Sequence, residues 1–263
     1  MSADGRLMLQ VCLCTHNPRP ETFHKVLTAL RHQTQRTCFE LVLVDNASNP
    51  PIEEWMCRNA LGDEIPLRIE RERTLGIAAA RIRAGEATTA DWILFVDDDT
   101  ELSPDYIEQG LRIIADNPTI GCFGGKLVLP DYLSPARWMR PLLPFLAIKD
   151  LGNEAVTSVA DEWRHCEPPT AGAFVRRSVL NRYLAMMRAN QLAPSLGRNR
   201  SSRGMFWQAF WELSHRSVLA ARSAASRTRA VLAGLSTCRQ YRTPAASRQL
   251  VFTGCLRKAS LSR

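Results

Sequence analysis

Three consecutive aspartates, Asp97–Asp98–Asp99, follow the apolar run Ile93–Val96 and form the most informative string in the sequence. Carboxylates this close together repel each other, and each loses solvation energy when it is partly buried. A divalent cation relieves both penalties, because Mg²⁺ and Mn²⁺ prefer carboxylate and phosphate oxygens and often bridge the two. If strand geometry continues through the triplet, Asp97 and Asp99 point the same way and share one ion. The alternative interpretation is a solvated acidic turn at the end of a strand.

Two further strings carry groups that suit a nucleotide. Val44–Asp45–Asn46 repeats the pattern of an apolar strand that ends in aspartate, and Asp45 is a candidate for contact with a base or ribose edge. Gly76–Arg81 opens a predicted helix with small residues, which permits close approach of a nucleotide. Arg81 lies one turn into that helix, where its guanidinium can reach phosphates or a ribose. For Arg81 alone, a surface salt bridge is an equally good interpretation.

These strings lie at the ends of predicted secondary-structure elements. From Leu9 onward, short apolar runs alternate with amphipathic segments. Apolar runs predict strands, and periodic apolar spacing predicts helices. The predicted strands are 9–14, 39–44, 67–70 and 92–96. Four helices are predicted. The first begins near Pro20 and places Phe23, Val26, Leu27 and Leu30 on one face. The second and third cover 52–61 and 77–87, and the fourth runs from an N-cap at Ser103 to about Asn117.

Such alternation predicts an α/β fold with a mostly parallel sheet flanked by helices on both faces. Ligands of these sheets bind beyond the carboxyl ends of the strands. The turn Thr15–Asn17, Asp45 and Asp97–Asp99 all follow predicted strands. We therefore expect the three features to meet at one edge of the sheet and to form a binding site.

Residues 121–190 continue the pattern less regularly. Residues 121–129 predict an edge or connecting strand, 168–176 a turn into a strand, and 177–190 a helix. Between them, residues 131–165 contain several prolines and an apolar group that comprises Trp138, Met139, Leu142, Leu143, Phe145 and Leu146. A substrate lid, a contact with a membrane surface and the packing of a long loop all fit this group, and we favour packing.

The charge is distributed unevenly along the 263 residues, whose net charge is +8. Residues 200–263 carry 12 Lys and Arg and a single acid, Glu212, whereas residues 1–199 sum to −3. The main part of the chain therefore offers no support for nucleic-acid binding. Without a long apolar run or a basic, apolar N-terminal signal, the sequence predicts a cytoplasmic location. The eight cysteines include no CxxC pair, so we expect structural thiols rather than disulfides or a metal cluster.

Four strings in this order and spacing resemble glycosyltransferase family 2: Cys14–Asn17, Val44–Ser48, Gly76–Arg81 and Phe95–Thr100. The resemblance implies a GT-A (Rossmann-like) fold over about Leu9–Arg176 and an inverting transfer from a nucleotide sugar, often a UDP-sugar. It also implies a bound Mn²⁺ or Mg²⁺. The acceptor would be a saccharide or a lipid-linked molecule, and a contact with the cytosolic face of a membrane is compatible with that.

The resemblance assigns roles to individual residues of this chain. The nucleoside pocket would be formed by Thr15, Asn17 and Asp45, and the rest of the donor site by Gly76, Arg81, Asp97 and Asp98. The metal would be held by Asp97 and Asp99, and Gly172 with Ala173 would form a strand on the acceptor side. The family places an acidic pair that supplies the general base in the loop beyond the next helix. Here the corresponding residues, Arg200–Gly204, include no acid.

This departure divides the chain into a predicted transferase domain, 7–199, and an Arg/Ser/Ala-rich tail, 200–263, expected to be irregular or loosely helical. Met and Trp have unique codons, so Gly204–Glu212 constrains the neighbouring reading frame. When the nucleotides that encode Gly204–Glu212 are read in the frame that starts one nucleotide earlier, they encode Val-Leu-Ala. This peptide is preceded by Asp when the codon of Gly204 is GGG. We therefore favour a frameshift near Arg200–Gly204 over a genuine basic helical tail that contacts anionic lipid.

Three alternatives remain at the level of sequence. The chain could bind nucleotide sugars without catalysis, because it lacks the expected base. A haloacid-dehalogenase-like phosphatase also uses an Asp-x-Asp string, but on its first strand and followed by Thr or Val where this chain has Glu101. A nucleotidyltransferase should begin with a glycine-rich loop, and Cys14–Pro18 contains no glycine.

Overall fold

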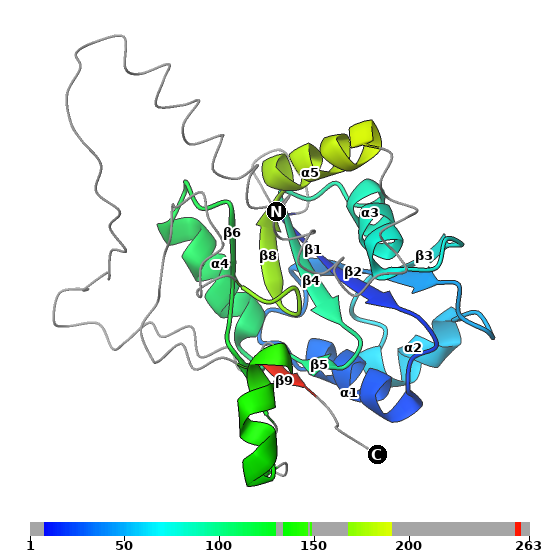
Figure 1. Cartoon of the computed structure of the whole chain (residues 1–263). Helices are drawn as coiled ribbons and strands as arrows, with labels where there is room; N and C mark the ends of the chain where they lie inside the picture. The colour runs from blue at the N-terminus through cyan, green and yellow to red at the C-terminus, as the bar shows by residue number, and fades with distance from the viewer. Residues whose placement is uncertain (1–7, 130–133, 147, 149–167, 191–255, 259–263) are drawn as a thin grey trace, which may run out of the picture.

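The computed structural model describes residues 8–129, 134–146, 148, 168–190 and 256–258. Its centre is a six-stranded sheet in the order β3-β2-β1-β4-β8-β6 (Figure 1). The strands are β1 (Leu9–Thr15), β2 (Phe39–Asn46), β3 (Leu67–Glu72), β4 (Trp92–Asp97), β6 (Cys122–Gly124) and β8 (Ala173–Arg176). The strands β1 to β4 are parallel, and β8 runs antiparallel to both β4 and β6. The prediction of a mostly parallel sheet is confirmed.

Helices cover both faces of this sheet. One face packs against α1 (Pro20–Arg31), α2 (Glu54–Leu61) and α4 (Tyr106–Asp116), and the other against α3 (Ile77–Ala87) and α5 (Arg177–Asn190). The alternation of β1 creates this division, because Leu9, Val11 and Leu13 join the first apolar cluster while Cys12 and Cys14 join the second. Thiols in β1 are therefore core residues, as expected from the sequence.

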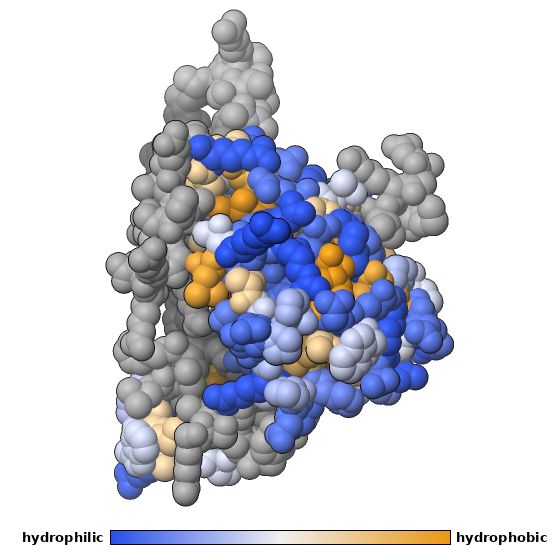
Figure 2. All heavy atoms as spheres, turned by 90° about the vertical axis from the view of Figure 1, so that its right-hand side faces the viewer, coloured by the Kyte–Doolittle hydropathy of each residue, from blue (hydrophilic) through white to orange (hydrophobic). Residues whose placement is uncertain are grey.

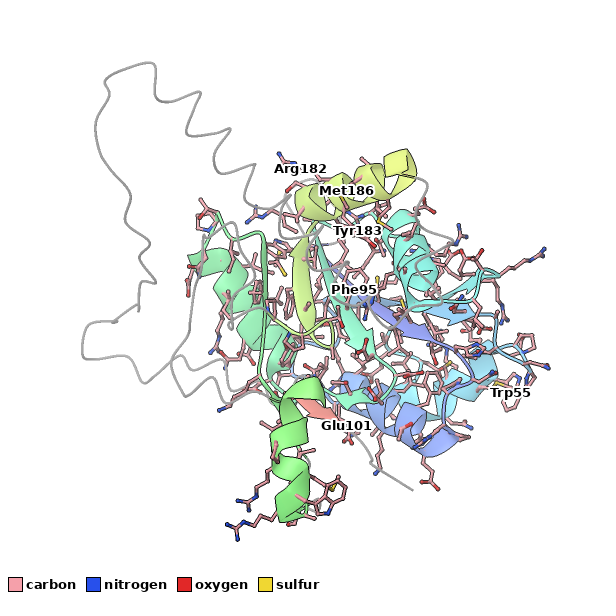
Figure 3. All side chains as sticks on the ribbon, viewed as in Figure 1. Trp55, Phe95, Glu101, Arg182, Tyr183 and Met186 are labelled. Carbon is pink, nitrogen blue, oxygen red and sulfur yellow. The ribbon has the colours of Figure 1, made fainter. Side chains whose placement is uncertain are left out.

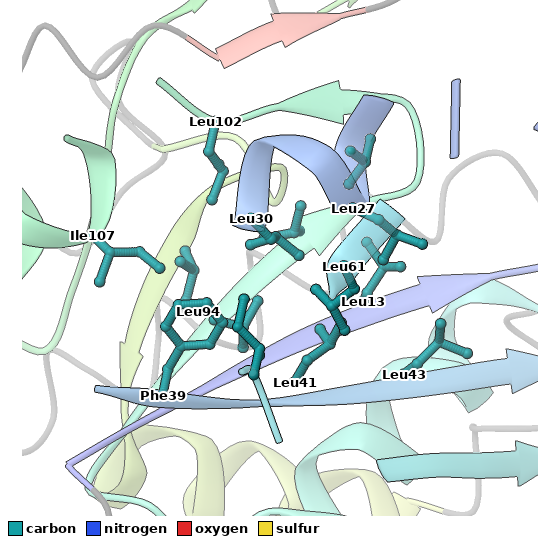
Figure 4. Close-up of a cluster of buried hydrophobic side chains, with 14 of the residues drawn as sticks. Leu13, Leu27, Leu30, Phe39, Leu41, Leu43, Leu61, Leu94, Leu102 and Ile107 are labelled. Atoms are coloured by element: carbon teal, nitrogen blue, oxygen red, sulfur yellow. The ribbon is translucent and has the colours of Figure 1, made fainter. Parts of the chain in front are cut away.

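The larger cluster packs along the whole length of β1, β2 and β4. Figure 4 shows Leu13, Leu41 and Leu43 of the sheet beneath Leu27 and Leu30 of α1. The side chains that α1 buries are the four predicted from its periodicity: Phe23, Val26, Leu27 and Leu30. Each fully buried leucine contributes about 1.5–3 kcal/mol to the free energy of folding, because its apolar surface is removed from water.

Two helices begin later than the sequence predicts. The prediction began α2 at Ile52, but the Ile52 N–H donates to the Asp45 carboxylate, 3.0 Å away, and the helix starts at Glu54. The N-cap of α4 is Asp105 rather than Ser103. Gln33 causes this difference, because its side chain donates to the Ser103 carbonyl at 2.7 Å and accepts from the Ile107 N–H at 3.0 Å.

A second, smaller sheet lies beyond β4. Its order is β5 (Thr100–Glu101), β9 (Leu256–Lys258) and β7 (Leu127–Val128). The segment 121–129, predicted as one strand, therefore supplies β6 to the large sheet and β7 to the small one. Residues 256–258 are a strand, whereas 200–255 and 259–263 lie outside the described residues, so the predicted character of the tail and the boundary at 199 stay predictions.

Two further features concern the surface. A 3-10 helix, η1 (Arg137–Leu146), extends away from the sheets at the bottom of Figure 1. On the face seen in Figure 2, hydrophilic residues predominate and hydrophobic ones form small separate groups. Within the described segments, no helix has the length and apolar character that a membrane span requires.

Candidate functional site

The carboxyl ends of the three central strands meet at one level. The Cα atom of Thr15 is paired with that of Asp45, and the Cα atom of Cys14 with that of Asp97. Because the strands are parallel and in this register, the turns after β1, β2 and β4 share one edge of the sheet. The three polar features predicted to converge are therefore neighbours.

The acidic triplet does not continue the strand. β4 ends at Asp97, Asp98 and Asp99 form a turn, and β5 begins at Thr100. The expectation that strand alternation aligns Asp97 with Asp99 is therefore wrong, because the backbone changes direction between them. The turn gives each carboxylate different partners from the chain.

Each of the three carboxylates accepts a hydrogen bond from a different element. Arg81 of α3 is 3% exposed, and its Nη2 lies 3.3 Å from Oδ1 of Asp97. Thr15 Oγ1 at the end of β1 donates to Oδ2 of Asp98. Thr100 Oγ1 donates to Oδ1 of Asp99 at 3.3 Å. The interpretation of Arg81 as a surface salt bridge is wrong, since the residue is buried and its partner belongs to the acidic triplet.

The charge balance of the edge is negative. Burial raises the pKa of Asp98; the Thr15 hydrogen bond opposes this shift, and the nearby Asp99 and Asp97 carboxylates add to it. Burial also raises the pKa of the Cys14 thiol to about 12, against the opposing effect of Arg81, so this thiol is neutral. The groups that remain are three carboxyl side chains and one guanidinium, which together attract a cation.

The carboxylates of the triplet are of the kind that a divalent metal prefers as ligands. Magnesium and manganese commonly bind through one or two carboxylates, with the remaining positions filled by substrate phosphates and water. Among the residues that the structure describes, no group of three or more His, Cys, Asp or Glu side chains could hold an ion by itself. All three carboxylates accept a hydrogen bond from the chain, so these contacts do not select among them, and Asp97 and Asp99 stay the predicted ligands. The metal itself stays a prediction.

The turns after β1 and β2 form the rim on one side of the triplet. Asn17 has a positive φ of 45°, its N–H donates to Ser48 Oγ at 2.9 Å, and its Oδ1 accepts from the Asn49 N–H at 2.8 Å. His16, which the sequence did not single out, bridges the same turns through Nδ1 and the Asn46 carbonyl, 2.7 Å apart. These contacts fix the exposed residues His16 and Asn17 against the turn after β2.

Asp45 lies beneath this rim. Its carboxylate is 1% exposed and accepts from the N–H groups of Ser48 and Ile52, each at 3.0 Å, and from Arg71 of β3. Burial alone would raise the pKa of Asp45, but the hydrogen bonds from Ser48, Ile52 and Arg71 lower it. Both oxygens are thus engaged by the chain, and the geometry favours Asp45 as a support for the rim rather than a direct contact to a base.

Asn46, next to Asp45, positions the start of α3. Its Oδ1 accepts from the Gly76 N–H at 2.8 Å, and its Nδ2 donates to the Thr74 carbonyl at 2.7 Å. Gly76 has φ of 142°, a conformation that side-chain-bearing residues rarely adopt. The N-terminus of α3 is therefore held at the same edge as the triplet, where its free N–H groups favour anionic ligands.

The predicted acceptor-side strand is joined to β4 near the triplet. Gly172 has φ of 85°, and its N–H donates to the Phe95 carbonyl at 2.7 Å. The Gly172 carbonyl accepts from the Tyr106 hydroxyl at 2.6 Å, and Ala173 begins β8 beside Phe95. Phe95 precedes Asp97 by two residues, so the Gly172 turn lies close to the carboxylates. The segment expected to hold a base, 200–204, lies outside the described residues.

Comparison with known proteins places these features in context. The sequence matches the model of the family described as Glycosyl transferase family 2 over residues 10–184. A Haemophilus influenzae protein named "Uncharacterized glycosyltransferase" is 29% identical over 113 residues, which are 43% of this chain and 36% of that protein. The chain therefore spans about a third of the length of that relative.

Solved structures of S. aureus TarS are similar in fold. TarS 1–349 in complex with UDP superposes with a TM-score of 0.54 at 14% identity, over 77% of this chain and 54% of that chain. TarS 1–349 alone gives a TM-score of 0.52 at 14% identity, over 77% of this chain and 55% of that chain. This chain thus covers about half of the TarS fragment, and at such low identity the likeness shows the GT-A fold.

Proposed function

Because the chain belongs to glycosyltransferase family 2, we propose that it transfers a sugar from a nucleoside diphosphate sugar to an acceptor hydroxyl. Family membership also excludes the phosphatase interpretation. That class of enzyme carries its Asp-x-Asp string on the first strand, whereas here the string follows β4. The acceptor class that we propose is a saccharide or a lipid-linked molecule. The proposed location is the cytoplasm, including the cytosolic face of a membrane.

One observation carries the proposal: Asp97, Asp98 and Asp99 lie together with Arg81 and Thr15 at the carboxyl edge of a parallel sheet. In the proposed complex, Asp97 and Asp99 would hold Mn²⁺ or Mg²⁺ beside the donor site. The bound ion would supply Lewis-acid stabilisation of the negative charge that develops on the departing diphosphate. Arg81 holds the Asp97 carboxylate in place, and Thr15 keeps Asp98 directed toward β1.

The nucleoside is proposed to lie on the rim formed by Thr15, Asn17 and the turn after β2. Asp45 lies below that rim and keeps its shape. A uridine nucleotide is the donor that we propose first, since the similar TarS structure is a complex with UDP. The Gly172 turn, which directly precedes β8, is proposed to face the acceptor, because its N–H is bonded to Phe95 of β4 near the triplet.

Inversion at the sugar requires the acceptor hydroxyl to attack from the face opposite the diphosphate while a base takes its proton. We assign this base to no residue of the chain, since Arg200–Gly204 contains no acid where the family pattern has one. A second candidate function follows from that sequence: the chain binds nucleotide sugars and lacks turnover. The two functions share the donor site and differ only in catalysis.

The test measures UDP release from a panel of UDP-sugars, with Mn²⁺, Mg²⁺ or a chelator, alongside calorimetric binding of UDP. Asp99→Asn is the test variant, and Asp116→Asn, an exposed acid at the end of α4, is its matched control. Metal-dependent release that Asp99→Asn alone abolishes supports the transferase. Metal-dependent binding without release supports the binder, and absence of nucleotide binding under all conditions would overturn both.

A further inference from the structure

The 3-10 helix η1 is an exposed element with a distinctive composition. Its sequence, Arg-Trp-Met-Arg-Pro-Leu-Leu-Pro-Phe-Leu, combines two arginines with apolar residues and prolines and contains no acid. The nearest acids along the chain are Asp131 and Asp150, on either side. Trp138 is 71% exposed, and Arg137 and Arg140 are exposed as well. The favoured interpretation from the sequence, packing of a long loop, is therefore wrong for Trp138.

The geometry of η1 groups these side chains. A 3-10 helix has three residues per turn, so Arg137 and Arg140 lie one above the other, with Trp138 on the adjoining ridge. Two cations therefore flank an exposed indole on a helix that extends away from both sheets (Figure 1). An indole beside guanidinium groups suits a boundary between apolar and aqueous phases, since the ring has an apolar body and a polar N–H.

The helix is attached to the body on both sides. Leu127 of β7, which precedes it, is 3% exposed, and Ile148, which follows it, packs against the larger apolar cluster. These anchors keep η1 near the small sheet, whose strand β5 directly follows the acidic triplet. A surface that η1 contacts therefore lies on the side of the molecule that carries the small sheet.

Charge decides between the surfaces that η1 could contact. An isologous contact with a second copy of the chain would bring equivalent patches together, and with them the arginines of both copies without a compensating acid. A bilayer with anionic lipids offers phosphates to both guanidinium groups and an interfacial layer to the indole. We propose that η1 docks on an anionic lipid surface, with Trp138 at headgroup level and Arg137 and Arg140 paired with lipid phosphates.

The experiment uses the full chain and vesicles of phosphatidylcholine, with or without phosphatidylglycerol. Co-sedimentation should show binding only to the vesicles that contain phosphatidylglycerol. Arg137→Gln/Arg140→Gln should weaken partitioning roughly twenty-fivefold, since each basic residue contributes about fivefold. Trp138→Ala should weaken it by about tenfold. The matched control is Trp55→Ala, because Trp55 is 67% exposed at α2, well away from η1 (Figure 3).

Brominated lipids then locate the contact, because bromine quenches only indoles that reach the bilayer. Fluorescence should be quenched in the wild type and in Trp55→Phe, and the quenching should be absent in Trp138→Phe. Residues 200–263 carry Trp207 and Trp211, so quenching that stays at the wild-type level in Trp138→Phe would place the contact in that basic segment rather than at η1. Unchanged binding in the Trp138 and arginine variants would overturn the proposal. So would quenching that survives Trp138→Phe, or light scattering that shows loss of a dimer in Trp138→Ala.

Discussion

Tyr106 links α4 to the Gly172 turn and offers a direct test of how the acceptor side is held. Its side chain is fully buried, and its hydroxyl donates to the Gly172 carbonyl at 2.6 Å and accepts from the Gly125 N–H at 2.8 Å. Burial raises the pKa of this phenol, so the hydroxyl keeps its proton and remains a donor. The substitution Tyr106→Phe removes the hydroxyl and preserves the ring that stacks on Phe174.

The magnitude follows from the two groups that lose a partner. A buried polar group left without a hydrogen bond costs about 1–3 kcal/mol, and here one carbonyl and one N–H are affected. Some relaxation around the missing oxygen lowers the total. We therefore expect Tyr106→Phe to reduce the free energy of unfolding by about 2–4 kcal/mol.

Urea unfolding of the full chain, followed by tryptophan fluorescence, measures this loss as a lower midpoint at an unchanged m-value. Trp55→Phe, an exposed aromatic substitution, is the control and should shift stability by less than about 0.5 kcal/mol. A midpoint for Tyr106→Phe within error of the wild type would refute the assignment of these hydrogen bonds. If the chain is active, the same variant should raise the acceptor KM and leave UDP binding unchanged.

Three further predictions concern packing, thiols and the gene. Gly110→Ala should destabilise the fold by about 1–3 kcal/mol in urea unfolding, because its Cβ would lie 2.2 Å from Phe174 Cζ; unaltered stability would contradict this packing. Burial raises the pKa of Cys57 to about 11, so native Cys57 should react with iodoacetamide about a hundredfold more slowly than in urea, by peptide mass spectrometry. Sequencing through codons 195–213 should show a shifted frame that encodes Asp-Val-Leu-Ala; an early stop codon there excludes the frameshift.

The periodicity of the sequence predicted those helices whose ends are set by neighbouring residues in the chain. The bounds of α3 and α5 agree with the prediction, since periodicity and flanking strands define both. The start of α4 could not be predicted, because Gln33, some seventy residues earlier, bonds to both Ser103 and Ile107. Propensity assigned Ser103 as the N-cap, and a tertiary contact overrode it.

The candidate site divides in the same way. Convergence of Thr15, Asp45 and the acidic triplet followed from the rule that parallel strands share a carboxyl edge. The burial of Asp45 could not be predicted by that rule. Its buried carboxylate is paired with Arg71, and Arg71 reaches Asp45 only through the register of β2 and β3. Likewise, the hydrogen bond from Thr15 to Asp98 joins residues 83 positions apart, and no local signal announces it.

The way in which β8 enters the sheet has a consequence for how such a chain can diverge. The predicted donor residues, from Thr15 to Asp99, lie at the carboxyl ends of β1, β2 and β4 and at the start of α3, all within the first part of the domain. The Gly172 turn is added afterwards, by an antiparallel strand joined to β4. Under the proposed function, insertions and exchanges downstream of α4 can therefore alter acceptor choice while the donor-binding residues are retained. New acceptor specificities in this architecture should arise by replacing the second half of the domain around a retained first half.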